Sequence, residues 1–498
     1  MVPTPLVMPL QIDTKWIIFF EIFYFFILIN VCIRIIYDTR SVSKTLAYVL
    51  FAIFVPFIGI AFYFSFGVNY RKRKIYSKKL SIDEALAKEV QEKIKRLDRQ
   101  IYKSDNPSII QNKSLYRLLL NEKTGSNPLL PSNSVKVLKN GEAFFKELIA
   151  ALHDAKHHIH IEFYIYENDV IGNTIKDILI EKVKEGVEVR FLYDDFGSRT
   201  IRKTIARELR NHGIAAYPFY KIRLMPFANR LNYRNHRKIV VIDGITSFIG
   251  GINVSDRYIN TQKDKPYWRD THMEIKGYAT YSLQQIFLSD WNFSSKENLG
   301  INRYYFPDYS ISTDGQGAGV QIVSSGPDSD LPNILYAVIK AITQAKHEIL
   351  LTTPYYIPDE SLQEVLIIAA LSGIDVKLLV PMHSDSKIVN LASKAYFENL
   401  LRAGVRIFLY NKGFIHSKTF VIDRILASIG TANLDLRSFD LNFEVNAIIY
   451  DKNVAEELAR QFDTDCSDAL EVVPDEWLKR SKFKKMIERL VRLISPFM

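Results

Sequence analysis

The sequence predicts a mixed α/β protein in which two similar α/β domains share one central cleft, preceded by a pair of transmembrane helices. Three observations lead to this prediction. The first 70 of the 498 residues are dominated by aliphatic and aromatic side chains, whereas the rest has the composition of a soluble protein. Two long segments of that soluble part resemble one another, as expected of a duplicated domain. Each repeat also contains the same short polar motif.

Two apolar runs predict a transmembrane helical hairpin over residues 1–70, with spans at about 16–36 and 46–68. Each run is long enough, because about 20 apolar residues cross a bilayer. Pro56 and Gly59 interrupt the second run, but membrane helices tolerate such residues. A cleaved signal peptide and a single span followed by a buried core helix are the alternatives. The hairpin is favoured over the signal peptide because no basic segment precedes the first run and no A-x-A-like site follows it.

Loop charge predicts how the hairpin is oriented. Lys15 and the basic cluster at residues 71–79 lie on one side of it, and only Arg34, Arg40 and Lys44 lie near the other. Positive charge is retained on the cytoplasmic side of a membrane. We therefore expect a multi-pass membrane protein, with its N-terminus and its large downstream region in the cytoplasm.

The formal net charge of +10 favours anionic partners, and nucleic acid and an anionic lipid surface both qualify. Charge alone does not choose between them, but the apolar N-terminus favours lipid over nucleic acid. The two cysteines, Cys32 and Cys466, exclude a disulfide scaffold and show no metal-ligand spacing.

Residues 71–130 predict a basic juxtamembrane and helical linker, with apolar residues such as Leu86, Val90, Ile94 and Leu97 at helical steps. Beyond it we expect a first α/β domain at 131–310, a second at 311–475, and a basic amphipathic helix at 476–498. That last helix has two open interpretations of equal weight: it lies on anionic lipid, or it docks on the protein.

The repeat is clearest between residues 144–195 and 333–381, each of which predicts a helix, a hydrophobic strand, a second helix and a second strand. The gaps suit parallel strands that are buried on both faces. His157, His158 and His160 at the first strand suggest a metal site, but no cysteine joins them and the matching repeat keeps only one histidine. We interpret them as the beginning of a strand.

Each repeat ends in the motif H-x-K-x4-D, followed by a turn of small residues that contains an asparagine. Residues two apart on a strand share a face, so each histidine and its lysine are expected to point into one cleft and each aspartate to point away from it. Two copies in matching repeats are far more specific than one. The residues are His236, Lys238, Asp243 and Asn253 in the first repeat, and His416, Lys418, Asp423 and Asn433 in the second.

These residue types suit attack on a phosphodiester. Such a reaction needs a nucleophile, an acid for the leaving oxygen and positive charge around the other oxygens. One neutral histidine can attack phosphorus while a protonated one donates to the departing alcohol, and lysines and asparagine amides can hold the remaining oxygens. The scheme requires no metal and no cofactor.

The duplicated motif resembles the signature of the phospholipase D superfamily, and the chain is most similar to its bacterial cardiolipin synthases over nearly the whole length. These segments separate such synthases from the nucleases of the superfamily. The segments that carry the resemblance are FGVNYRKRK (66–74), LYDDFGSR (192–199), YWRDTH (267–272), SSGPD (324–328), PYYIPD (354–359) and GTANLDLRSFDLNFEVN (430–446).

The resemblance implies that the two histidines, two lysines and two aspartates of the motifs form the catalytic set, with Asn253 and Asn433 in support. Asp270 and Glu444 occupy corresponding positions after the two motifs. Buried carboxylates there would bind the far nitrogens of the histidines and fix their tautomers, although surface acids are the alternative. The motif aspartates fall on the other strand face, which favours a structural role for them.

The resemblance further implies that the protein transfers a phosphatidyl group between two phosphatidylglycerol molecules, giving cardiolipin and glycerol. A lipid hydrolase or another phosphatidyltransferase is the main alternative. A nuclease-like phosphodiesterase and a non-enzymatic scaffold are disfavoured by the hairpin and by the two complete motifs. His236 follows a basic approach and His416 follows apolar residues, which favours His236 as nucleophile and His416 as acid and base.

Overall fold

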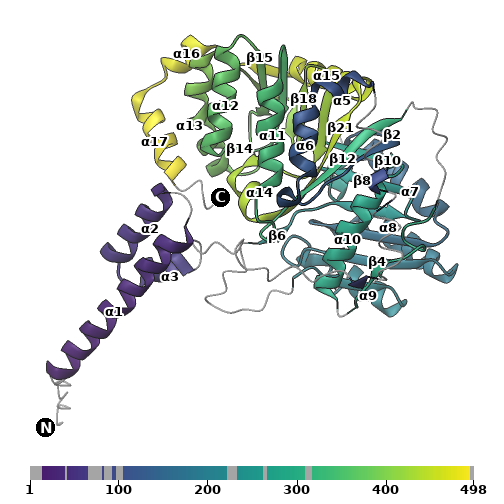
Figure 1. The fold of residues 1–498 in the computed structure, drawn as a ribbon, viewed down its shortest axis with the longest axis horizontal. Helices are drawn as coiled ribbons and strands as arrows, with labels where there is room; N and C mark the ends of the chain where they lie inside the picture. Colours follow the sequence, from purple (N-terminus) through teal and green to yellow (C-terminus); the bar gives the residue numbers. More distant parts are fainter. Residues whose placement is uncertain are drawn as a thin grey trace, which may run out of the picture. The chain divides into compact units, whose positions relative to one another are not determined.

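A computed structural model of the protein describes most of the chain (Figure 1). It contains two compact units, the first made of residues 1–72 with 223–232, and the second of 73–222 with 233–498. The described residues are 14–39, 42–64, 81–82, 92, 94–96, 105–220, 233–261, 266–295, 297–308 and 317–493.

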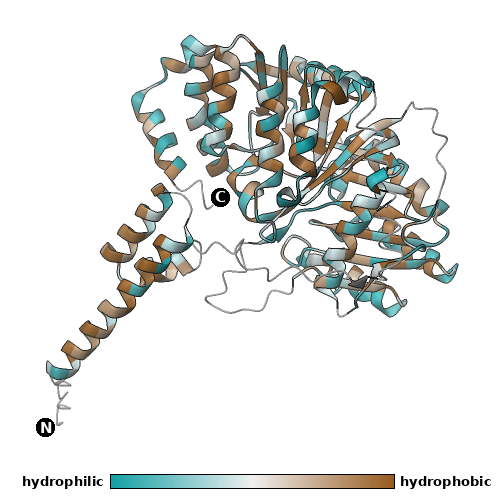
Figure 2. Ribbon diagram, in the orientation of Figure 1, coloured by the Kyte–Doolittle hydropathy of each residue, from teal (hydrophilic) through white to brown (hydrophobic). Residues whose placement is uncertain are grey.

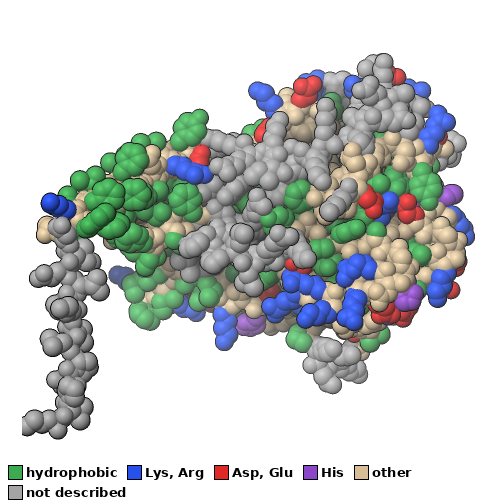
Figure 3. Space-filling model, turned by 90° about the horizontal axis from the view of Figure 1, so that it is seen from below, with side chains coloured by type: hydrophobic (Ala, Val, Ile, Leu, Met, Phe, Trp, Pro, Cys, Tyr) green, Lys and Arg blue, Asp and Glu red, His purple; other side chains and the backbone are tan. Residues whose placement is uncertain are grey.

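The described part of the first unit consists of apolar helices: α1 (Thr14–Asp38), α2 (Val42–Phe54) and α3 (Ile58–Phe62). The rings of Tyr24 and Phe57 lie 4.9 Å apart, so the chain after α2 has returned alongside the middle of α1. Most residues of these helices are hydrophobic (Figure 2), and many of their side chains lie exposed at the surface (Figure 3). Of the described helices, α1 alone is both long and apolar enough to cross a membrane.

The second predicted span is not one continuous helix. Residues 55–57 separate α2 from α3, and Phe57 has a φ of 62°. Pro56 explains the break, because it has no N–H to donate and its ring disfavours helical geometry in the preceding residue. The last part of the predicted span, residues 65–68, lies outside the described residues.

Within the described part of the second unit, fifteen strands in a row form one sheet whose two halves repeat the same order, and a sixteenth strand, β6, pairs with it outside that row. From the centre outward, the first half contains β2 (Leu129–Lys139), β10 (Thr271–Lys276), β8 (Thr246–Gly250), β7 (Ile239–Ile242), β3 (His158–Phe163), β4 (Glu188–Tyr193) and β5 (Ala215–Pro218). The second half contains β12 (Ala318–Ser325), β21 (Asn442–Tyr450), β19 (Leu426–Gly430), β18 (Thr419–Ile422), β13 (Glu348–Thr352), β15 (Asp375–Pro381), β16 (Arg406–Tyr410) and β22 (Ala469–Glu471). The halves join where β12 pairs with β2.

The strands predicted as parallel pairs do pair in that way, β3 with β4 and β13 with β15. The next pairs outward, β4 with β5 and β15 with β16, are parallel as well. The pairs from β3 to β2 and from β13 to β12 are antiparallel, and within them β7 and β8, like β18 and β19, are consecutive strands joined by tight turns. Short pairs complete the described strands. These are β1 (Ser81–Ile82) with β11 (Gly300–Ile301), β6 (Arg234–Asn235) with β21, β9 (Tyr267–Arg269) with β17 (Gly413–Ile415), and β14 (Tyr356–Ile357) with β20 (Leu434–Asp435).

Helices cover both faces of the sheet. On one face, α10 and α15 contribute to a single core that runs across both halves, whereas the other face carries a separate core for each half. The helices are α5 (Pro107–Gln111), α6 (Lys113–Leu120), α7 (Asn140–Asp154), α8 (Val170–Lys184), α9 (Ile205–Asn211), α10 (Thr280–Ser294), α11 (Asn333–Gln344), α12 (Glu360–Leu371), α13 (Lys387–Ala403), α14 (Leu436–Asp440), α15 (Lys452–Ser467), α16 (Pro474–Leu478) and α17 (Lys482–Leu493).

Part of the segment expected as a linker packs into this unit. Leu115, Tyr116 and Leu119 of α6 are buried in the same core as the apolar face of α11. Ile94 is also buried, but Leu86, Val90 and Leu97 lie outside the described residues.

Candidate active site

The two motif histidines reach one cavity of about 350 Å³. The first half of the sheet contributes His236 and Asn253 to its lining, and the second contributes His416 and Asn433. The described structure therefore brings together four of the predicted polar residues. The cavity has the size and the convergent polar groups expected of a small-molecule site.

Two short strand pairs explain this convergence. Strand β6 ends just before His236 and runs parallel to the start of β21, so the His236 N–H donates to the Phe443 carbonyl at 2.9 Å. Strand β17 ends just before His416 and runs parallel to β9, so the His416 N–H donates to the Arg269 carbonyl at 2.7 Å. Each motif histidine is thus held in place by a backbone hydrogen bond to a strand of the other half.

The histidines and lysines do not lie in the strands expected of them. Strand β7 begins one residue after Lys238, and β18 begins one residue after Lys418. The cause is that the chain passes from a short strand, β6 or β17, to a strand of the main sheet, β7 or β18. The three residues between the two strands include the histidine and the lysine. Both lysines are nevertheless fully buried below the histidine backbone, where each Nζ donates to the carbonyl of its own histidine.

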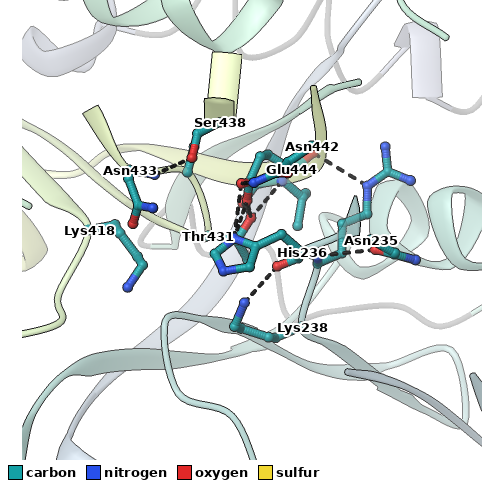
Figure 4. Close-up of polar contacts among 12 residues, drawn as sticks. Asn235, His236, Lys238, Lys418, Thr431, Asn433, Ser438, Asn442 and Glu444 are labelled. Atoms are coloured by element: carbon teal, nitrogen blue, oxygen red, sulfur yellow. Dashed lines mark hydrogen bonds and ion pairs between the residues drawn. The ribbon is translucent and has the colours of Figure 1, made fainter. Parts of the chain in front are cut away.

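The orienting carboxylates are exchanged between the halves. Both carboxylate oxygens of Glu444 lie 2.9 Å from Nδ1 of His236 (Figure 4). In the other unit, Oδ2 of Asp270 lies 2.7 Å from Nδ1 of His416. Both acids are completely buried, which excludes the alternative of surface acids. A carboxylate at Nδ1 holds the proton on that nitrogen and leaves Nε2 free to act as a base or nucleophile.

Electrostatics keep the carboxylates charged and the histidines neutral. Burial lowers the pKa of both histidines to about 4, although the partner carboxylates act in the opposite direction. Burial alone would raise the pKa of Glu444 and of Asp270, but the neighbouring histidines and lysines outweigh burial and hold it below its usual value. A neutral imidazole is the form that can attack phosphorus.

The two lysines have unusually low proton affinity. Burial lowers the pKa of Lys238 to about 7 and that of Lys418 to about 8, against the attraction of Glu444 and Asp270. Nζ of Lys418 also lies 2.9 Å from Nδ1 of His416. A phosphate that enters the site would raise the pKa of both lysines, because a nearby negative charge stabilises their protonated form.

The two asparagines hold the turns around the cavity. The side-chain oxygen of Asn253 accepts from the Ile165 N–H at 3.1 Å, and its amide donates to the Tyr258 hydroxyl at 2.8 Å. Asn433 donates to a carboxylate oxygen of Asp435 at 3.0 Å. Their remaining capacity to bind a ligand is therefore smaller than the sequence suggested.

The motif aspartates do not reach the cavity. Asp243 turns out of β7 in a left-handed conformation, with a φ of 54°. Its carboxylate accepts from the N–H groups of Lys156, His157 and His158 at 2.7–2.9 Å, and Asp423 makes the equivalent three bonds to residues 346–348. Each motif aspartate thus fixes the backbone at the start of the neighbouring strand, β3 or β13.

The three histidines at that entrance lie away from the cavity. His158 and His160 belong to β3 and are completely buried, and both bind the side-chain amide of Gln284. The ring of His160 stacks on that of Phe287 at 4.4 Å. No cluster with the ligand set of a metal ion occurs among the described residues.

Sequence reasoning found the unequal approaches to the two motifs but missed most of the residues that make the cavity lining asymmetric. Arg234 and Arg437 line it together with Tyr164, whose ring lies 4.8 Å from that of His236. The ring of His416 instead lies within 6 Å of the rings of Trp268 and Phe414. Only the basic and apolar approaches to the two motifs signalled this difference.

Two buried arginine–aspartate pairs were also missed. Arg237, between the first histidine and lysine, donates to Asp290 of α10 at 2.7 Å. Arg269, just before Asp270, donates to Asp465 of α15 at 2.8 Å. Isolated arginines and aspartates carry no signal in a sequence, so their pairing was visible only in the fold.

The fold and the site together define the class. Two repeats that fuse into one sheet bring two histidines to one cavity, with a buried carboxylate and a buried lysine beside each of them, which is the arrangement of a phospholipase D-type phosphodiester transferase.

Comparisons with known proteins agree with this class. The family described as "Cardiolipin synthase, PLD-like domain" matches residues 148–291 and 338–466, and the phospholipase D-nuclease N-terminal family matches residues 22–67. The chain is 40% identical to the major cardiolipin synthase ClsA of Bacillus subtilis over 482 residues, which cover 95% of this chain and 98% of that protein. It is 41% identical to the cardiolipin synthase of Alkalihalophilus pseudofirmus over 466 residues, covering 94% and 91%. The chain therefore belongs to the cardiolipin synthase family of phospholipase D-like proteins.

A solved structure supports the fold alone. The crystal structure of phosphatidylserine synthase from Haemophilus influenzae aligns with a TM-score of 0.55 at 16% sequence identity, covering 78% of this chain and 100% of that one.

The exchanged carboxylates lead to a prediction. Asp270→Asn and Glu444→Gln should each lower cardiolipin formation by about 100-fold or more, because the histidine of the opposite half loses its tautomer and its alignment. Glu274→Gln is the matched control: it changes the acid of β10, the strand that begins directly after Asp270, and this acid pairs with the exposed Lys276 rather than with a histidine. Initial rates would be measured on variants with unchanged circular dichroism. Wild-type turnover of Asp270→Asn would contradict the assignment.

Proposed function

We propose that the protein makes cardiolipin by joining two phosphatidylglycerol molecules with release of glycerol. The observation that carries this proposal is the pair of histidine–carboxylate units in one cavity, each unit built from both halves. Membership of the cardiolipin synthase family makes the chain a phosphatidyltransferase, and the relatives from Bacillus subtilis and Alkalihalophilus pseudofirmus are both named cardiolipin synthase.

The first step forms a covalent intermediate. Nε2 of His236 attacks the phosphorus of one phosphatidylglycerol, and the bond from phosphorus to the head-group glycerol oxygen breaks. His416, protonated in the presence of the substrate, gives its proton to that oxygen and glycerol leaves. The phosphodiester anion raises the pKa of His416 from its low value in the empty site, because it stabilises the imidazolium.

The second step completes the transfer. His416, now neutral, takes the proton from the terminal hydroxyl of a second phosphatidylglycerol, whose oxygen attacks the phosphohistidine. Cardiolipin forms, His236 is released as neutral imidazole and His416 is again protonated. Lys238 and Lys418 neutralise the phosphate oxygens in both steps, supported by the amides of Asn253 and Asn433.

The unequal surroundings of the histidines support these roles. Arg234 and Arg437 give the His236 side the positive charge that would attract a phosphate. On the His416 side, Trp268 lines the cavity with Arg257 over its ring, and the rings of Trp268 and Phe414 pack beside His416, which would limit water at the proton-transfer residue. In this proposal Asp243 and Asp423 belong to the catalytic set only because they fix the starts of β3 and β13, the strands that pair with the motif strands β7 and β18.

A hydrolase or another phosphatidyltransferase on this scaffold is the alternative function. It differs only in the acceptor: water gives phosphatidic acid, and another alcohol gives another phospholipid. The scheme itself involves no metal, no cofactor and no nucleic acid.

Product analysis tests the function. Purified protein given phosphatidylglycerol vesicles should form cardiolipin and glycerol in equal amounts, because each transfer releases one glycerol. A chelator should leave most of the rate intact. Phosphatidic acid as the main product would support the hydrolase instead, and a rate restored only by one divalent ion would contradict the metal-free scheme.

Trapping tests the assignment of roles. His416→Ala should still form a phosphatidyl adduct on His236 when the donor has a good leaving group, because such a group departs without a proton. His236→Ala should form no adduct from the same donor. Both variants should lose several orders of magnitude in turnover, since the histidines act as a unit. Mass spectrometry of peptides locates the adduct, and an adduct on His416 would reverse the roles.

We further propose that the first unit anchors the protein in the bacterial cell membrane as a hairpin, with spans near 16–36 and 46–68. The exposed apolar surface of α1 supports a span rather than the core helix of a soluble protein. Residues 71–130 then connect the hairpin to the halves at 131–310 and 311–475, and both termini lie in the cytoplasm.

Labelling tests the orientation. Leu371, at the end of α12, is 70% exposed and suits a reporter cysteine. In a background without Cys32 and Cys466, Leu371→Cys should resist a membrane-impermeant maleimide in intact cells and react after permeabilisation. Equal reaction in both states would overturn the orientation and leave the enzymology untouched.

A further inference from the structure

The C-terminal helix α17 docks on the protein through charged side chains. Glu488 is only 2% exposed and forms two bonds with Arg480, at 2.7 and 3.0 Å. Lys485 and Arg489 both lie within 4 Å of Glu398 on α13, at 3.6 and 3.4 Å. The face of α17 turned toward the protein therefore contains these charged side chains, together with the half-buried Ile487 and Val491 at its edge.

The opposite face of α17 is apolar and exposed. Phe483, Met486, Leu490 and Leu493 are 68%, 50%, 55% and 70% exposed. Their spacing of three, four and three residues places them along one side of a helix. A helix at the surface of a globular protein normally turns such a stripe toward the core, so the orientation of α17 is inverted.

Charge indicates which surface would cover this stripe. Lys482 and Lys484 are exposed beside Phe483, and the described part of α17 carries Glu488 as its single acid, which faces inward. A helix with an apolar side, flanking lysines and an aromatic residue is typical of binding in the head-group region of an anionic membrane. A protein–protein interface is a poorer match, because such interfaces are depleted in lysine.

We propose that α17 is a second membrane contact of the chain, which inserts Phe483, Met486, Leu490 and Leu493 into the interface of an anionic bilayer. The two interpretations of the C-terminal segment thus hold together: the helix docks on the protein and offers lipid its outer face. The contact is separate from the candidate active site and does not depend on the proposed reaction.

Fluorescence tests the contact in the full-length protein reconstituted in vesicles. An environment-sensitive label is attached to Leu490→Cys, in a background without Cys32 and Cys466. Val170→Cys on α8 is the matched control, because Val170 is a single exposed apolar residue, 75% exposed, in the other half of the sheet. The vesicles contain phosphatidylcholine alone, or phosphatidylcholine with either phosphatidylglycerol or phosphatidylserine, which separates surface charge from substrate.

The label at position 490 should shift to the blue and lose intensity to brominated lipid in both anionic vesicles, and much less in phosphatidylcholine alone. The label at position 170 should stay accessible to aqueous iodide in all three. Adding Lys482→Gln and Lys484→Gln should reduce the shift at 490, and so should high salt, since exposed charges are screened.

Two results would overturn the proposal. One is equal iodide quenching at positions 490 and 170 in anionic vesicles. The other is protection of position 490 that follows protein concentration and not lipid charge, which would identify a second copy of the chain as the occupant. Thermal unfolding of each labelled variant shows that the fold is retained, as expected for substitutions at exposed positions.

Discussion

The bond between each histidine and the carboxylate of the other half is the interaction on which the site depends. It requires the short parallel pairs β6–β21 and β9–β17, which carry His236 to Glu444 and His416 to Asp270. Those pairs in turn require the halves to be fixed against each other, which the central β2–β12 pairing and the shared core provide. Fold and chemistry are therefore linked at a few backbone hydrogen bonds.

Burying so many charged side chains lowers the stability of the fold unless each one has a partner. In this site the partners lie one behind another. The lysines lie beneath the histidines, and the carboxylates lie behind them. Behind these, Arg237 and Arg269 bind Asp290 and Asp465 from the helices that cover the common core. Losing any one partner would leave an unpaired charge in a site from which water is largely excluded.

The sequence predicted the repeat, the first parallel pair of each half and four polar residues of the cavity, because each rests on a local pattern. Period and spacing identify a strand or a motif wherever it occurs. They do not report which half supplies a partner, so the exchange of Asp270 and Glu444 was beyond reach. The second span was expected as one helix because its composition is apolar throughout, yet the missing N–H of Pro56 divides it. The structural role expected of Asp243 fits its bonds to three backbone amides.

The two buried arginines also bear on how the repeats should be compared. Arg237 corresponds in sequence to Ser417, and Arg269 corresponds to Phe443, so neither arginine is matched by another. In space, however, each guanidinium binds the aspartate of its covering helix and the carbonyl of an orienting acid, Glu444 or Asp270. Each orienting acid therefore has a buried guanidinium beside it, although the two arginines come from different positions of the repeat. A residue-by-residue alignment of the repeats would count Arg237 and Arg269 as two differences. In the structure they make the same contacts, one beside each orienting acid.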